Sequence, residues 1–451
     1  MSYQKSKRLP FERANKLGHL EVIQSPLVRE ICKNFEEPTI DESSFQNLKW
    51  ESLPHDGLDL KVIFTSDGSI QFLENPKPPF KSVAFVKTAL LKIDDYSISK
   101  IDKNNPHPFT LRDIMINSAL YHSTVFPLRN IYLKGKSTYY AIREIIYESI
   151  NDKGLNNSLN KALMETLKWI AFEKWSDDPK DELERFGCPH CEKNVATLPF
   201  DKEKGKCPNC QEEIFITDMF GLHQNISEDF APNQIASDYM NICETLMIFT
   251  PICFYWEKQK DFLKNCLFIK DGPLSLRATL AKLSAPIRRF FKHAKSQGIE
   301  IALIGQEKSG DFFDHLQLIA QYAPNNSFFL PDNTYIQEKI KHRKTNAVYG
   351  VDTNYGAKVF IKLNDYNKMV LNVPTGERGE FVTHPSSEKL IGFKNIIATL
   401  PKILSNRFEG ALVPIELANN IASLSTYPSA KTLELFTESL KLMGTSKKGY
   451  F

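Results

Sequence analysis

The sequence predicts an α/β protein with a mixed β-sheet. Short apolar runs typical of strands alternate along the chain with longer segments in which apolar residues recur every three or four positions, as in amphipathic helices. Two of the apolar runs, VIF (62–64) and LFI (267–269), lead into an Asp-Gly pair. A cysteine-rich segment interrupts the alternation at residues 188–210. We therefore expect a sheet flanked by helices, with one inserted segment of different character.

Composition places the chain among ordinary globular proteins. It has 451 residues, 42% hydrophobic and 25% charged, which is enough for two or three domains around a large core. The formal net charge of +3 neither requires nor excludes a nucleic-acid partner. The N-terminus lacks the apolar region of a signal peptide, and the longest apolar window, ICETLMIFTPICFYW, is too short to span a bilayer. We expect a cytoplasmic protein without a membrane association.

The first half of the chain should hold the first strands and a helical region. A strand is expected at about 60–73, and the segment SVAFVKTALLKIDDYSIS (82–99) alternates as a second strand. Residues 110–175, beginning with TLRDIMINSALYHSTVF, carry the spacing of helices and are expected to be mainly helical.

The second half continues the alternation. The helix QIASDYMNICETLMIFTPICFYWEKQ leads into a strand at 266–270, and the next helix, 274–297, ends at Gly298. Further strands are expected at 299–311 and in YGAKVFIKL and NKMVLNVPT, before a helix at 414–425. The expected domains are an N-terminal segment of short helices and loops (1–50), the first part of a core with its helical region (51–180), the cysteine-rich insertion (181–216), the second part of the core (217–430) and a C-terminal helix and tail (431–451).

Four of the eight cysteines form two C-x-x-C pairs, Cys188 with Cys191 and Cys207 with Cys210, separated by about fifteen residues. This is the pattern of a zinc ion held by four thiolates. No coordination position is left open, so we expect a structural zinc ion rather than a zinc-dependent hydrolase. A pair of redox disulfides is the alternative in an oxidising compartment.

Three acids are candidates for a second metal centre. Asp67 and Asp271 follow apolar strands and precede a glycine, and Glu244 lies on an apolar helix, where an unpaired charge is costly. Carboxylates converging from two strands and a helix are the ligands that Mn²⁺ or Mg²⁺ needs, and such ions support phosphodiester hydrolysis. The alternative is that Asp-Gly is a common turn dipeptide and that Glu244 caps its helix or pairs with a lysine.

Basic residues follow the second Asp-Gly pair. Arg277 is the first of several in the expected helix 274–297, and Lys308 ends the next strand. Near an acidic metal site they would neutralise the phosphates of a polyanionic substrate. On a solvated helix face the same residues would have no such role.

The order of several motifs resembles the NurA nuclease family. The motifs are FTSDGSIQ, ICETLM, LFIKDGPLSL, IALIGQEKS, TNYGAKVFIKL and EGALVPIELANNIASLS, and the resemblance covers about residues 55–430. It implies an RNase H-like core, here a mixed sheet flanked by helices with an inserted four-cysteine zinc ribbon. It also implies a manganese-dependent DNA nuclease that works as a homodimer beside the hexameric ATPase HerA.

Site residues carry over by position. Asp67, Glu244 and Asp271 resemble the catalytic, metal-binding acids of the family, and Lys308, Arg277 and Tyr355 are the residues expected to contact substrate. The zinc ribbon is not part of the family's minimal pattern, and it could contact DNA or a protein or only stabilise the fold. The helix in the C-terminal segment of the family often presents a further polar or histidine side chain to the metals, where this chain offers the candidates Glu416, Asn419 and Asn420.

The sequence therefore predicts an enzyme that hydrolyses DNA with Mn²⁺ or Mg²⁺ bound by Asp67, Glu244 and Asp271. It would act as an exonuclease, with endonuclease activity left open, and process DNA ends in repair or anti-phage defence. No phosphate-loop motif occurs in the sequence, so a HerA-like hexameric ATPase would supply translocation. The alternative is a catalytically inactive nuclease scaffold whose zinc ribbon makes it an adaptor for nucleic acid or for a partner ATPase.

Overall fold

The computed structural model describes residues 18–35, 45–75, 77–102, 119–152, 159–227, 230–276 and 282–440, together with residues 104, 107, 109, 111 and 112. The expected substrate contact Arg277 lies outside the described residues, as do parts of the predicted N-terminal segment and of the C-terminal tail. The chain divides into two compact units, Met1–Leu48 and Lys49–Phe451. The first unit contains the helices α2 (Gly18–Gln24) and α3 (Pro26–Lys33).

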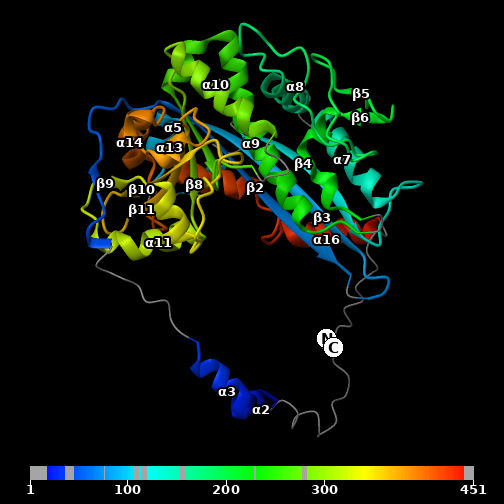
Figure 1. Ribbon diagram of the computed structural model, residues 1–451, viewed down its shortest axis with the longest axis horizontal. Helices are drawn as coiled ribbons and strands as arrows, with labels where there is room; N and C mark the ends of the chain where they lie inside the picture. Colours follow the sequence, from blue (N-terminus) through cyan, green and yellow to red (C-terminus); the bar gives the residue numbers. More distant parts are fainter. Residues whose placement is uncertain are drawn as a thin grey trace. The chain divides into compact units, whose positions relative to one another are not determined.

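The second unit is built on a nine-stranded sheet with the order β1-β9-β10-β11-β8-β7-β2-β3-β4 (Figure 1). Within the sheet, β2, β7 and β8 run parallel to one another, and the other neighbouring strands are antiparallel. The predicted mixed sheet is therefore confirmed. The strands are β1 (Glu51–Ser52), β2 (Val62–Glu74), β3 (Ser82–Asp94), β4 (Ala119–Arg129), β7 (Cys266–Asp271), β8 (Ala302–Glu307), β9 (Ser327–Phe329), β10 (Ala357–Lys362) and β11 (Lys368–Val373).

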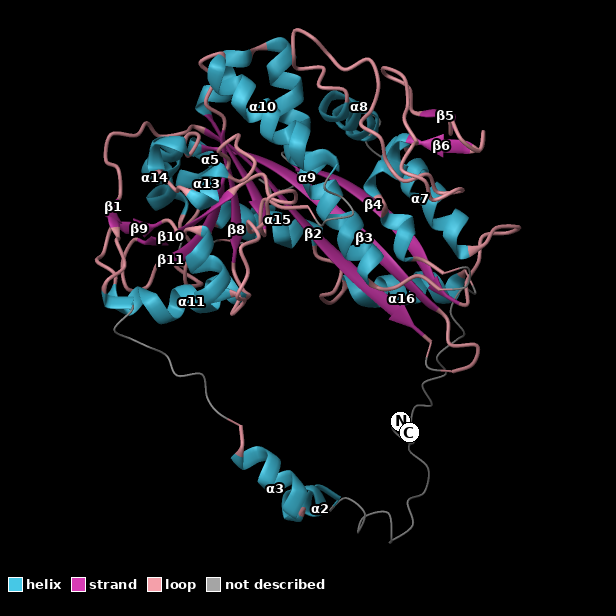
Figure 2. Cartoon of the chain, viewed as in Figure 1, coloured by secondary structure: helices cyan, strands magenta, loops and turns pink. Residues whose placement is uncertain are grey.

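Helices pack against both the long and the short strands of this sheet (Figure 2). They are α5 (Asp95–Ser99), α7 (Thr138–Asn151), α8 (Leu159–Ala171), α9 (Gln234–Lys258), α10 (Ser284–Ser296), α11 (Asp311–Ile319), α12 (Asn333–Tyr335), α13 (Glu380–Thr383), α14 (Phe393–Ile403), α15 (Val413–Ala422) and α16 (Ser429–Ser439). Short 3-10 or π-helical segments are η2 (Ile216–Phe220), η3 (Leu222–Asn225), η4 (Lys260–Asn265), η6 (Ala320–Tyr322), η7 (Ile336–Ile340) and η8 (Ser387–Lys389). No helix in the described part of the chain is long and apolar enough to cross a membrane.

Alternate residues of the central strands enter two different cores. Phe64 of β2 and Phe268 of β7 pack in the core that contains the apolar residues of α9. Ile63 of β2, with Leu267 and Ile269 of β7, packs in the core that contains those of α14 and α15. Since side chains alternate between the faces of a strand, even-numbered residues of β2 and β7 face α9, and odd-numbered residues face α15.

Two secondary-structure predictions were wrong. The segment 119–126, predicted to be helical, lies in β4, where β-branched and aromatic residues such as Thr124, Val125 and Phe126 pair with β3. The pairing partner is distant in sequence, so the local spacing of apolar residues misled the prediction. Among the described residues, the helix predicted from residue 274 is found from Ser284, and Ser275, inside the predicted helix, instead forms a bridge to Asn354 in a distant loop.

Candidate functional site

Asp67 and Asp271 lie at adjacent positions on neighbouring parallel strands. β2 and β7 pair in a register that matches Ser66 with Lys270, so the two aspartates come next on each strand. Both are odd-numbered and therefore face α15. β7 ends at Asp271, followed by Gly272 with a φ of 82°, whereas β2 continues to Glu74. The predicted strand end is thus present at Asp271 and absent at Asp67, which lies inside its strand.

Gly68, on the face of β2 opposite Asp67, allows α9 to approach the strand closely and brings Glu244 to the same edge of the sheet. A Cβ atom at Gly68 would lie 2.7 Å from Glu244 Oε1 and would also overlap the side chain of Met240. Ser66, on the same face, donates a hydrogen bond of 3.1 Å to the carbonyl oxygen of Glu244. The pairing of β2 with β7 ends at Ser66. Among the described residues, no other strand pairs with that edge of β2 beyond this point. The sheet therefore has a notch at the end of β7, with Asp67 on one side and Glu244 on the other.

The Asp67 carboxylate is buried and only partly satisfied. Its side-chain Oδ1 accepts a hydrogen bond of 2.7 Å from the Gly68 N–H, but Oδ2 has no hydrogen-bond partner among the described residues. Burial, together with the charges of Asp271 and Glu244, raises the pKa of Asp67 to about 8. A buried carboxylate oxygen without a donor, beside two further acids, is stabilised by a cation.

Two lysines hold the other two acids. Lys270 Nζ donates a hydrogen bond of 2.7 Å to Glu244 Oε2 and one of 3.0 Å to the carbonyl oxygen of Asp271. Lys308 Nζ lies 2.7 Å from Asp271 Oδ1. Burial raises the pKa of Glu244, and the Lys270 ammonium opposes that rise. The sequence analysis did not identify Lys270. Because side chains alternate along a strand, the residue before Asp271 faces the opposite side of the sheet, toward α9.

The three acids share the notch without forming a closed cage. Within the described ranges, the four cysteines are the only group of three or more His, Cys, Asp or Glu side chains whose ligand atoms all lie within 4.8 Å of one another. The Lys308 side chain is 39% exposed and the Lys270 side chain only 2% exposed. A divalent cation would therefore displace Lys308 from Asp271, while Lys270 stays on Glu244. The oxygen donors and the unpartnered Asp67 Oδ2 fit a hard divalent cation.

A cavity of about 420 Å³ adjoins Lys308. Glu416, Asn419 and Asn420 of α15 line it, so all three candidates for a further ligand open into one space. Glu416 Oε1 is buried without a hydrogen-bond partner among the described residues, and Arg407 lies 3.9 Å from its other oxygen. Of the three, Glu416 is the one with an unsatisfied oxygen.

Several expected substrate contacts are occupied inside the fold. Tyr355 is 2% exposed, and its hydroxyl lies 3.4 Å from Thr245 Oγ1. Burial raises the pKa of Tyr355. Arg288 donates a hydrogen bond of 2.6 Å to the Asn354 carbonyl oxygen, and Arg289 pairs with acids at 2.5 and 2.8 Å. Among the predicted contacts that the structure describes, Tyr355 is buried near Lys270 and Glu244, and Lys308 has a partly exposed side chain at the notch.

The four cysteines meet as the sequence predicted. The Sγ atoms of Cys188 and Cys210 lie 3.7 Å apart, and those of Cys191 and Cys207 lie 3.9 Å apart. Four sulfurs around a zinc ion at about 2.3 Å would be separated by about 3.8 Å. The cluster is therefore consistent with a zinc site. It lies beside a hairpin formed by β5 (Lys204–Lys206) and β6 (Glu213–Phe215).

The cysteine-rich segment is continuous with the main core. Cys188 and Cys207 belong to the same apolar cluster as the residues of α9. Arg143 of α7 donates a hydrogen bond of 2.7 Å to Asp218 of η2, which follows the segment, and both side chains are buried. The Tyr139 hydroxyl donates one of 2.7 Å to the Pro189 carbonyl oxygen. A metal ion here would stabilise the packing of α7 as well as the hairpin.

We expect Cys207→Ser to lose zinc and to lower the melting temperature, because structural zinc sites contribute folding free energy directly. Zinc content per chain, measured by plasma mass spectrometry, and thermal unfolding would test this. Cys32→Ser changes an exposed cysteine and should leave both values unchanged. Equal zinc content in the two variants would contradict a four-thiolate site.

The raised pKa of Asp67 predicts a pH-dependent stability without added Mn²⁺ or Mg²⁺. The folded state binds more protons than the unfolded state between the ordinary aspartate pKa and the folded value of about 8, so stability falls as pH rises through that range. Asp67→Asn should remove this part of the slope and be more stable than the original chain at about pH 8. Urea unfolding across the range measures it. Asp314→Asn, at an exposed position, is the control, and equal slopes for the original chain and Asp67→Asn would contradict the assignment.

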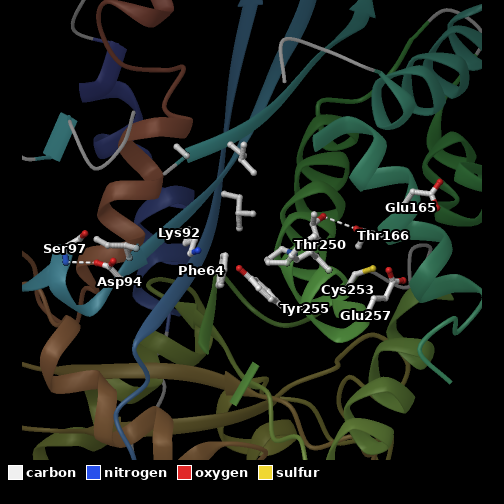
Figure 3. Close-up of a pocket in the computed structure, with 16 residues that line it drawn as sticks. Phe64, Lys92, Asp94, Ser97, Glu165, Thr166, Thr250, Cys253, Tyr255 and Glu257 are labelled. Carbon is white, nitrogen blue, oxygen red and sulfur yellow. Dashed lines mark hydrogen bonds between the residues drawn. The ribbon is translucent and has the colours of Figure 1, made fainter. Parts of the chain in front are cut away.

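A larger cavity, of about 740 Å³, lies away from the notch (Figure 3). Phe64 and Lys92 line it from the sheet, and Thr250, Cys253 and Tyr255 line it from α9. Its walls include none of the three acids and neither lysine of the notch. Size alone therefore does not identify the candidate site.

No protein-family model matches the sequence, and no curated protein matches it significantly. Among solved structures, one described as "Crystal structure of NurA" shares 10% sequence identity over 96% of this chain and 98% of that chain, with a TM-score of 0.27. Another, "Crystal structure of NurA with manganese", shares 11% identity over 95% and 98% of the two chains, with a TM-score of 0.22. Because these TM-scores are low, the two structures are not used to infer a function, and the functional proposal is based on the geometry of the site.

Proposed function

We propose that this protein is a metal-dependent nuclease that hydrolyses phosphodiester bonds in DNA. The observation that carries the proposal is the buried Asp67 Oδ2, which has no hydrogen-bond partner among the described residues, beside Asp271 and Glu244. Burial and the charges of Asp271 and Glu244 raise the pKa of Asp67, so its ionised form is unfavourable without a cation. Hard divalent cations such as Mn²⁺ and Mg²⁺ are the usual occupants of an all-oxygen site.

Each residue of the notch has a distinct task in this proposal. Asp67 and Asp271 hold the cation from neighbouring strands, and Glu244 completes the site with the oxygen that Lys270 leaves free. A bound divalent cation would supply Lewis-acid stabilisation and lower the pKa of a nearby water. Lys308, once displaced from Asp271, is free to bind a substrate phosphate. None of these tasks reads a base, so cleavage would be largely independent of sequence.

The sequence resemblance to NurA nucleases supports the proposed fold, metals, oligomeric state and partner. On that basis the core is RNase H-like, the four cysteines hold a structural zinc ion, and the cation is Mn²⁺ or Mg²⁺. The enzyme acts as a cytoplasmic homodimer beside a HerA-like hexameric ATPase and processes DNA ends in repair or anti-phage defence.

One observation favours the alternative of an inactive adaptor. Glu244 and Asp271 already pair with Lys270 and Lys308, and an inactive scaffold would keep its acids neutralised in this way. The unpartnered Asp67 Oδ2 argues against it, because a scaffold without a cation gains nothing from a buried, unsatisfied carboxylate.

Digestion of linear DNA by the full chain tests the proposal. Hydrolysis should occur with Mn²⁺ or Mg²⁺ and stop with EDTA, and the small diester bis(p-nitrophenyl) phosphate should follow the same pattern. DNA binding without hydrolysis of either compound would support the adaptor instead.

A further inference from the structure

A strongly basic loop contacts the start of α11, which follows Lys308 by three residues. We call residues 339–344, KIKHRK, the basic loop. Residues 342–344 are exposed, and they line a hollow of about 660 Å³ together with Glu338, Thr345 and Asn346. In the described part of the chain, the one ion pair of the basic loop joins Lys341 to Asp311. Lys339, Arg343 and Lys344 therefore present charges that the fold does not neutralise.

Hydrogen bonds hold the basic loop in place. The Arg343 N–H donates one of 2.7 Å to the Gln337 carbonyl oxygen. The Gln337 side chain in turn donates one of 2.9 Å to the carbonyl oxygen of Ala347, which closes the turn. His342 at its centre has a φ of 51°, a backbone conformation that costs energy in a residue with a side chain. A ligand would thus meet a loop that needs little ordering.

A chain of contacts connects the basic loop to the notch. Lys341 Nζ lies 2.8 Å from Asp311 Oδ2, at the start of α11, and over the Phe312 ring. Asp311 follows Lys308 by only three residues, and Lys308 pairs with Asp271. The Lys341 ion pair therefore joins the basic loop to the start of α11, three residues after Lys308.

We propose that the basic loop binds the phosphate backbone of the nucleic-acid substrate beyond the cleaved bond. This inference rests on the proposed nuclease function. The four cations of the loop face two nearby acids, Glu338 and Asp311, so the net charge attracts a polyanion. The Arg343 guanidinium matches the geometry of a phosphate group. Such contacts position the strand without reading its sequence.

Fluorescence anisotropy tests the inference by measuring the binding of a fluorescein-labelled oligonucleotide. EDTA is present so that no cleavage occurs. Arg343→Gln/Lys344→Gln should weaken binding and reduce the slope of log K against log salt by about 1 for each lost phosphate contact. The same variant should cleave DNA more slowly at subsaturating concentrations. Its hydrolysis of bis(p-nitrophenyl) phosphate should be unchanged, because this compound is too small to reach the loop.

Lys49→Gln/Lys258→Gln is the matched control, since it also removes two exposed charges and should leave binding nearly unchanged. Equal affinity and equal salt slope in the loop variant and the control would overturn the inference and would leave the loop available to an acidic protein partner. If the original chain hydrolyses neither DNA nor the small diester, the proposed function fails instead. The two failures are therefore distinguishable.

Discussion

Asp271→Asn and Asp67→Asn should each lower the Mn²⁺-dependent hydrolysis of DNA on the order of a thousandfold, because either change removes the charge that holds the cation responsible for activating water. Asparagine keeps the shape of the side chain, so the loss reflects charge and not packing. The kcat/KM of the purified variants measures the activity, and calorimetric titration with Mn²⁺ measures the accompanying loss of affinity. Both readouts should change together.

Asp314→Asn on α11 is the control for these variants. It removes one exposed carboxylate that has no ion pair in the described part of the chain, and it should retain activity and Mn²⁺ affinity. Full hydrolysis by Asp271→Asn at the same Mn²⁺ concentration would show that the cation is held elsewhere.

Lys270→Met should be the most destabilising single change in the notch. The ion pair between Lys270 and Glu244 is almost completely buried, and removing one partner of such a pair leaves an uncompensated charge that costs about 3–5 kcal/mol. Urea unfolding without added divalent cation measures the loss. Because the isolated Glu244 can take up a proton, the destabilisation should be smaller at low pH and grow as pH rises.

The second substitution Glu244→Gln should restore much of the lost stability in the Lys270→Met background. It removes the buried charge that Lys270 neutralised, and a double-mutant cycle then isolates the coupling between the two residues. Lys61→Met provides the comparison at an exposed pair, because the Lys61 and Asp95 side chains are 57% and 43% exposed and such pairs contribute about 0–1 kcal/mol. A cost for Lys270→Met no greater than that for Lys61→Met would contradict a buried, structurally required pair.

The candidate acids could be proposed from sequence because each stands out against its neighbours, although Asp-Gly is also a common turn dipeptide. Asp67 and Asp271 come after short apolar runs and before a glycine, and Glu244 interrupts an apolar helix. The four cysteines were equally clear from their spacing. In each case, burying a polar or reactive side chain at that position is unfavourable unless the side chain binds a metal ion or a hydrogen-bond partner, and this can be recognised from the sequence.

The alternative that Glu244 pairs with a lysine is confirmed by Lys270, but which lysine meets which acid could not be predicted, because it depends on contacts between distant segments. The Lys308 contact with Asp271 follows from the pairing of β7 with β8, and the burial of Tyr355 follows from a loop that packs near α9. The strand at 119–129 was mistaken for a helix for the same reason. Lys270 and the basic loop, by contrast, had a sequence signal in strand alternation and in a run of basic residues.

A crystal of the full chain grown with Mn²⁺ and measured at the manganese absorption edge would locate the cation directly. The proposed nuclease site predicts an anomalous peak at the notch, with Asp67 Oδ2 and Asp271 as ligands and Lys308 moved away from Asp271. Saturating Mn²⁺ with no peak at the notch, and with Lys308 still on Asp271, would contradict it.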